Sequence, residues 1–247
     1  MAHRFFQKLA HKVAQLGWLN AGWYTLGQLL TLLSRGRWTL LKYQFVAQAV
    51  GTGSLARGRG RQIEVHHCAR LDQLPPDYPR PPAVLAERYA QGAQSLAALR
   101  HGELLGFLWL RFGAYQEDEV RVRYLLASAQ SCWDFDVWVR PQDRLGLTFP
   151  RLWDEANRLL RARAVRWSCS RISAFNGASL RAHAAIGTVD LGSATFLCCG
   201  RWQWMLSTLA PYLHLSRHPG AWPRLSFDTS KLAHLPTMEP LCPTLKP

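Results

Sequence analysis

The sequence predicts an α/β protein whose core is one mixed, mostly antiparallel sheet flanked by helices, preceded by an amphipathic helix. Two observations lead to this prediction. Residues 62–200 show strand and helix patterns in the order strand, helix, three or four antiparallel strands, helix, strand, helix, strand, which differs from the regular alternation of a doubly wound sheet. The 247 residues are 48% hydrophobic and include 11 tryptophans, a composition that supplies a sizeable core and excludes a disordered chain.

The formal charge of +14 is unevenly distributed along the chain. Residues 1–61 hold nine Lys/Arg and no Asp/Glu, residues 62–200 hold 16 basic and 14 acidic residues, and residues 201–247 hold five and two. This pattern predicts a basic N-terminal arm with a linker (1–61), a nearly neutral domain (62–200) and an aromatic, Pro-rich C-terminal arm (201–247). It disfavours a uniformly basic nucleic-acid binder and indicates an anionic membrane surface as a partner of residues 1–61.

The N-terminal arm contains an uncharged run of 22 residues, 13–34. Large apolar side chains recur in this run at spacings of three and four, which predicts one stripe along a helix: Leu16, Leu19, Trp23, Leu26, Leu30 and Leu33. Such a helix can lie in a membrane interface, dock on its own domain or a partner, or span a membrane. Residues 40–50 then predict a strand, and the Gly- and Arg-rich residues 51–61 predict a solvated linker.

The remaining elements follow in chain order. The predicted strands are residues 63–67, 95–100, 104–112, 119–126, 132–139, 165–172 and 189–199, and the predicted helices are residues 83–91, 148–163 and 176–186. Alternation along 132–139 predicts that Asp134 and Asp136 share one face. Apolar spacing in 201–215 indicates a helix as far as Pro211, and the Pro-rich remainder is expected to be extended.

Residues 62–200, most clearly 133–188, resemble the GNAT superfamily of N-acyltransferases. The similarity rests on a strand ending in Val139-Arg140-Pro141, a loop with Arg144-Leu145-Gly146, a long helix, and an Asn-led helix carrying Asn176, Ser179, His183 and Gly187 at the family's spacing. The resemblance implies a pair of parallel strands that splay apart. Their free N–H and C=O groups would hold the pantetheine arm of an acyl donor, and a helix N-terminus would face its pyrophosphate.

The resemblance also implies roles for individual residues. The donor, an acyl-CoA or the acyl-phosphopantetheine of an acyl carrier protein, would contact Val137, Val139, Arg144, Leu145, Gly146, Leu147, Thr148, Asn176 and Ser179. His183 occupies the position of the family's Tyr that protonates the leaving thiolate, a role open to an imidazole. Asp134 or Asp136 is the candidate base. Helix capping alone equally explains Asn176.

The loop before the long helix departs from the family pattern. Leu147 and Phe149 stand where the pyrophosphate loop normally has small residues, and Gly146 lies one place early. Bulky residues at these positions favour a donor other than ordinary CoA, such as an acyl carrier protein, or a degenerate site.

The acceptor is expected to be an amine, either a small molecule or a lipid. Glu117 and Glu119 lie in an acidic turn that can bind a cation, and Arg121 and Arg171 can hold an anionic group or pair with these carboxylates. No metal-ligand pattern occurs, and the six cysteines are expected to be reduced thiols. The prediction is a metal-independent N-acyltransferase in the cytoplasm, peripheral at the inner face of the membrane. The alternative is a non-catalytic GNAT-like module that binds a membrane or protein partner.

Overall fold

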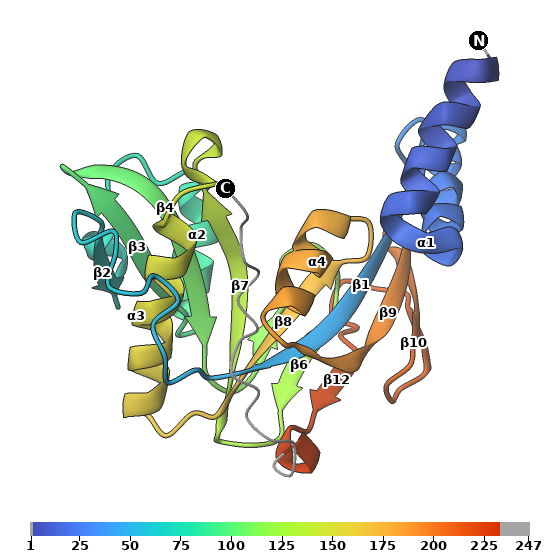
Figure 1. Cartoon of the computed structure of the whole chain (residues 1–247). Coiled ribbons are helices and arrows are strands. Elements are labelled where there is room, and N and C mark those ends of the chain that lie inside the picture. The colour runs from blue at the N-terminus through green and yellow to red at the C-terminus, as the bar shows by residue number, and fades with distance from the viewer. Residues whose placement is uncertain (1, 233–247) are drawn as a thin grey trace.

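A computed structural model of the chain describes residues 2–232, with side chains from Lys12 onward (Figure 1). Two sheets are present in this part of the chain. The large sheet has nine strands in the spatial order β11 (Leu213–Ser216), β10 (Trp202–Ser207), β9 (Val189–Cys199), β1 (Trp38–Ala49), β8 (Trp167–Ser173), β7 (Ser131–Val139), β4 (Glu103–Arg111), β3 (Gln94–Arg100) and β2 (Glu64–Cys68). The small sheet has the order β12 (Arg224–Phe227), β6 (Arg123–Leu126) and β5 (Tyr115–Gln116).

Helices cover both faces of the large sheet. The α-helices of residues 2–232 are α1 (Ala2–Leu33), α2 (Pro82–Ala90), α3 (Thr148–Ala162) and α4 (Gly177–Ala185), and the short 3₁₀ helices are Leu71–Gln73, Pro141–Asp143 and Ser230–Leu232. The predicted mixed α/β class is confirmed. Among the described strands of the large sheet, β7 and β8 form the parallel pair, and the other neighbours are antiparallel.

The core is divided between the two faces of the large sheet. On one face, which we call the α2 face, α2 and the small sheet enclose an aromatic cluster that includes Tyr43, Phe45, Trp109, Trp133 and Phe227. On the other, the α3 face, the apolar side of α3 packs through Leu152, Trp153, Ala156 and Leu160 onto the sheet. Burial of these large side chains is the main stabilising contribution to the fold.

The sheet continues across both predicted segment boundaries. β1, from the predicted N-terminal arm, pairs with β8 on one side and β9 on the other, so it is a central strand. Most of residues 51–61 are exposed, as expected for a solvated linker, but Ala56 is buried and the segment is held by α3. The Asp154 carboxylate of α3 accepts hydrogen bonds from Ser54 Oγ at 2.7 Å and from the backbone N–H of Leu55 at 2.6 Å, so this loop packs along α3.

Two further predictions are wrong. The predicted helix within 201–215 is the β10–β11 hairpin, in which Gln203, Met205 and Ser207 alternate inward. The spacing of Trp202, Met205, Leu206 and Leu209 fits a helix, whereas Trp202 and Trp204 fit the strand period of two, so apolar spacing alone was misleading. The predicted strand 119–126 begins only at Arg123 and joins the small sheet. The Pro-rich residues from 233 onward lie outside the described residues.

The N-terminal helix exists as predicted but has a break. Gly17 adopts non-helical angles (φ 75°, ψ 162°), which only a residue without a side chain reaches easily, and α1 is kinked there. The stripe that we predicted is therefore divided: Leu16, Trp23 and Leu30 are half-buried, whereas Leu19, Leu26 and Leu33 are exposed. Across residues 2–232, no helix combines the length and the apolar character needed to cross a membrane.

Candidate functional site

The parallel strands β7 and β8 separate partway along their length. Their pairing runs from Ser131↔Trp167 to Asp134↔Ser170 and does not continue beyond that pair in the described chain. Further along, β7 pairs only with β4 and β8 only with β1, so the edges that face each other lack a strand partner. In Figure 1 the two strands diverge between α3 and α4. Unpaired strand edges offer N–H and C=O groups to an extended, amide-containing ligand.

A bulge in β7 lies directly after the last paired residue. Asp136 has a positive φ of 48°, and the register with β4 passes from Trp109↔Phe135 to Phe107↔Trp138, which leaves one extra residue on β7. An extra residue reverses the alternation of side chains. The prediction that Asp134 and Asp136 share a face is therefore wrong: Asp136 lines a pocket on the α2 face with Phe135, whereas Asp134 points to the α3 face.

Asp134 is buried at the point where the strands part. Its carboxylate accepts hydrogen bonds from the hydroxyls of Ser168 at 2.6 Å and Ser170 at 2.7 Å, both on β8. Burial raises the pKa of Asp134 above its ordinary value, and the two hydroxyls and the nearby His183 oppose that rise. This carboxyl consequently holds a proton more readily than a solvated one.

His183 lies buried on α4, on the same face of the sheet as Asp134. Its Nδ1 is 2.8 Å from the backbone oxygen of Ser179. A carbonyl oxygen only accepts, so Nδ1 carries the proton and Nε2 is the atom left for proton transfer. Asn176 is confirmed as the helix cap, because its Oδ1 accepts from the Ser179 N–H at 3.1 Å.

The N-terminus of α3 lies beside the end of β7. No side chain caps this helix, and its first turn presents the N–H groups of Thr148 and Phe149, whereas Pro150 has none. Leu147 and Phe149 pack against the core on the α3 face, so their bulk is partly directed inward. Arg144 reaches back to the Val139 carbonyl oxygen at 3.2 Å, and Leu145 beside it is fully exposed.

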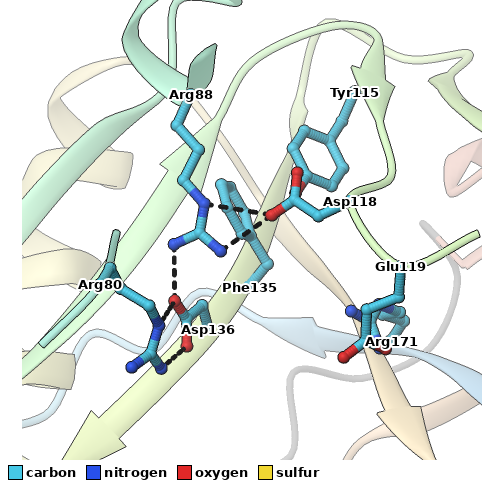
Figure 2. A pocket seen from close by; sticks show the side chains of 8 residues that line it. All are labelled: Arg80, Arg88, Tyr115, Asp118, Glu119, Phe135, Asp136 and Arg171. Atoms are coloured by element: carbon cyan, nitrogen blue, oxygen red, sulfur yellow. Dashed lines mark hydrogen bonds and ion pairs between the residues drawn. The ribbon is translucent and has the colours of Figure 1, made fainter. Parts of the chain in front are cut away.

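A pocket of about 440 Å³ lies on the α2 face (Figure 2). Its lining combines guanidinium groups, carboxylates and two aromatic rings: Arg80, Arg88, Tyr115, Asp118, Glu119, Phe135, Asp136 and Arg171. Asp136, Glu119 and Arg171 are thus brought together as predicted site residues. Asp118 belongs to the predicted acidic turn, between Glu117 and Glu119. The two arginines before β3 were missed, because only folding brings α2 and its preceding loop over the β7 bulge.

The carboxylates of the pocket differ in their free acceptor atoms. Both oxygens of Asp136 are engaged by Arg80, and Oδ2 also accepts from Arg88 at 2.5 Å. Burial alone would raise the pKa of Asp136, but the hydrogen bonds from Arg80 and Arg88 outweigh it and lower that pKa. Asp136 therefore holds the two guanidinium groups in place by ion pairing and is a weak proton acceptor.

Asp118 and Glu119 each keep one oxygen available. Asp118 uses Oδ2 for Arg88, and Glu119 uses Oε2 for Tyr43 at 2.5 Å and Arg171 at 3.1 Å. Among the described residues, Asp118 Oδ1 and Glu119 Oε1 have no hydrogen-bond partner. These two oxygens are the pocket's unused acceptors, so the pocket suits a cationic group.

Arg121 and Arg171, which we predicted either to hold an anionic group or to pair with the carboxylates, are both occupied by the protein. Arg171 forms a paired interaction with Glu117 through Nε (2.5 Å) and Nη2 (2.8 Å), and Glu117 is buried behind the pocket wall. Burial raises the pKa of Glu117, and Arg171 opposes that effect. Arg121 lies elsewhere and donates to the carbonyls of His218 and Arg201. Within the described chain, no cluster of three or more metal-ligating side chains occurs.

Comparisons with known proteins return only distant similarities. No protein-family model matches the chain, and no curated protein matches it. Among solved structures, a conserved Staphylococcus epidermidis protein of unknown function is 10% identical, with a TM-score of 0.44 over 69% of this chain and 65% of that one. A Drosophila protein is 16% identical, with a TM-score of 0.40 over 72% of this chain and 57% of its own length.

A third solved structure carries a functional description. It contains the GCN5-related glucosamine N-acetyltransferase region of a fungal multi-domain GH3 β-N-acetylglucosaminidase, 14% identical, with a TM-score of 0.41 over 67% of this chain and 22% of that protein. In all three cases this chain spans less than two thirds of the other protein.

Proposed function

We propose that this protein is a GNAT-like N-acyltransferase that moves an acyl group from a phosphopantetheine thioester to an amine. The observation that carries the proposal is the parting of β7 and β8, with a helix N-terminus beside it on one face and a carboxylate pocket on the other. One strand pair thereby gives two substrates access from opposite faces, as a bimolecular transfer requires.

The donor arm would lie along the unpaired edges of β7 and β8 on the α3 face. The residues offered to it are the backbone of Val137 and Val139, with Asn176 and Ser179 at the start of α4. The two free N–H groups of α3 and the exposed Arg144 would meet its phosphate. A first turn with only two donors suits the single phosphate of a carrier-bound phosphopantetheine better than a nucleotide pyrophosphate.

The acceptor would enter from the α2 face as an ammonium ion held by Asp118 Oδ1 and Glu119 Oε1. Glu119 is the proposed base, because one of its oxygens is free and its side chain is half-exposed to water that can carry the proton away. The amine nitrogen then forms a C–N bond with the thioester carbon, the C–S bond breaks, and the leaving thiolate takes the proton that His183 holds on Nε2 when both ring nitrogens are protonated. The nitrogen loses its second proton as the amide forms, and that proton restores the one that His183 gave. The products are an amide and a free thiol, with one proton released from the ammonium.

The proposal is tested by incubating purified protein with acyl-CoA and acyl-carrier-protein donors and a panel of amines. Amide product and free thiol are followed by mass spectrometry. Glu119→Gln is expected to lower turnover, whereas Asp72→Asn, a matched change in an exposed Arg–Asp pair, is expected to leave it unchanged. If every donor fails and neither CoA nor carrier protein shifts the melting temperature, the protein is a non-catalytic binding module instead.

A further inference from the structure

The outer face of α1 is the largest run of exposed apolar side chains on a single described element. Its residues are Trp18, Leu19, Leu26, Leu29, Leu32 and Leu33, and three of them, Trp18, Leu19 and Leu33, are 80–81% exposed. They lie on one side of the helix after the Gly17 kink, along the positions 18, 22, 26, 29 and 33. We call this surface the α1 outer face.

The inner side of the same helix combines small and polar residues with a few large side chains, of which Trp23, Tyr24 and Leu30 are half-buried. Ala21 and Gly27 are buried, and a Cβ on Gly27 would lie 3.4 Å from the Leu40 side chain of β1. Asn20 accepts a hydrogen bond from Lys42 Nζ at 2.9 Å. A helix that only covered its own sheet would place its leucines inward and its polar residues outward. In α1 five of the six leucines between residues 18 and 33 are exposed instead, which marks the outer face as a contact surface.

Charge identifies what this face meets. Lys12 precedes the exposed stretch, Arg35 and Arg37 follow it, and the first 61 residues contain no acidic side chain. Arg35 and Arg37 are exposed in the turn between α1 and β1. Cations at both ends of an apolar face fit a helix lying flat in a layer of anionic headgroups, with its leucines and Trp18 directed into the acyl region.

We infer that the α1 outer face docks this protein on an anionic lipid surface. The contact does not cross the membrane, in keeping with the length and composition of α1. It lies at the end of the large sheet formed by β1, β9 and β10, away from α2 and α3 (Figure 1). Docking therefore leaves the pocket on the α2 face open, and the inference does not depend on the proposed activity.

Vesicle co-sedimentation of the full chain tests the inference. Binding to phosphatidylcholine vesicles is compared with binding to vesicles that contain about 30 mol% of the anionic lipid phosphatidylglycerol. Each exposed Arg is expected to raise partitioning onto the anionic vesicles about fivefold at low salt. At about 0.5 M NaCl the Debye length falls to about 4 Å, so most of the preference for anionic vesicles is expected to disappear. Leu29→Glu/Leu33→Glu is expected to reduce binding at least about tenfold, because two charges would enter the acyl region. Arg35→Glu/Arg37→Glu should remove the preference for anionic lipid.

A control is Leu71→Glu, which places one such charge on an exposed leucine outside α1 and should bind vesicles like the wild type. Melting temperatures of all variants establish that they fold. The vesicle-induced blue shift of tryptophan fluorescence should be largely lost in Trp18→Phe. The inference is overturned by equal affinity for neutral and anionic vesicles, by no binding, or by an equal loss in Leu71→Glu. A dimer that dissociates in Leu29→Glu/Leu33→Glu without any vesicle binding would assign the face to a second copy and also overturn it.

Discussion

Replacing Arg88 by Met should destabilise the protein and disturb the candidate acceptor pocket together. Arg88 comes from α2, its side chain is 7% exposed, and its guanidinium bridges two carboxylates. Nε and Nη2 donate to Asp118 Oδ2 at 3.2 and 2.9 Å, and Nη1 donates to Asp136 Oδ2 at 2.5 Å. Methionine keeps the aliphatic contacts with the surrounding rings but removes the charge and all three hydrogen bonds.

The size of the effect follows from the burial of the partners that remain. Removing one member of a buried ion pair costs about 3–5 kcal/mol, because the other member is left desolvated. Asp136 keeps Arg80, and the side chains of Asp118 and Asp136 are 26% and 16% exposed, so water restores part of the loss. We expect a loss of about 2–3 kcal/mol in the free energy of unfolding.

Urea unfolding at pH 7 measures this loss as a shift of the midpoint at constant m-value. The control is Arg158→Met, which removes an exposed i,i+3 pair with Glu155 on α3 and should cost less than about 0.5 kcal/mol. If Arg88→Met costs no more than this control, the bridge behaves as a solvated surface pair and our reading of the pocket is refuted.

Three further outcomes are expected. Asp134→Asn should be at least as stable as the wild type at pH 7. Burial raises the folded-state pKa of Asp134 above an unfolded value of about 3.9, so its contribution to stability is greatest at low pH and falls as pH rises toward that folded pKa. Urea titrations between pH 4 and 8 should show a smaller decline for the variant, and an unchanged decline would contradict the assignment. Gly177→Val adds a side chain whose Cβ would lie 2.8 Å from a backbone oxygen of α1, which is too close. Hydrogen exchange of residues 18–33 should therefore accelerate while the sheet stays protected. His183→Phe should lower kcat about 100-fold, whereas His183→Tyr should retain more activity; equal activity in all three proteins would exclude a role in proton transfer.

The fold was largely predictable because its central strands and two of its helices carry strong local patterns. The hairpin of β3 and β4, the run of residues in β7 and the apolar side of α3 are each specified by residues close in sequence. Long-range pairing was not predictable. Nothing local in β1 indicates that it is inserted between β8 and β9, more than 100 residues later in the chain.

The candidate site was predictable only where one strand or one turn supplies it. Asp136, Glu119 and Arg171 belong to segments that alternation and the acidic turn make conspicuous. Arg80 and Arg88 precede them on a Pro-rich connector and on α2, and their ion pairs with Asp136 span 56 and 48 residues, respectively. A buried arginine on a short helix has the same local pattern as a solvated one, so sequence alone could not identify its partners.

The extra residue of the β7 bulge explains why the prediction for Asp134 and Asp136 was wrong, and it also places these two carboxylates on opposite faces of the sheet at the proposed site. Strict alternation would direct Asp134 and Asp136 to the same face, and the two carboxylates would then compete for one environment. The αL conformation of Asp136 separates them, one into a pair of serine hydroxyls and the other into a pair of arginines. Their pKa values consequently shift in opposite directions, upward for Asp134 and downward for Asp136. A residue at this position that strongly resists positive φ, such as valine or isoleucine, would be expected to restore the regular strand, extend the β7–β8 pairing and remove the opening between the two faces.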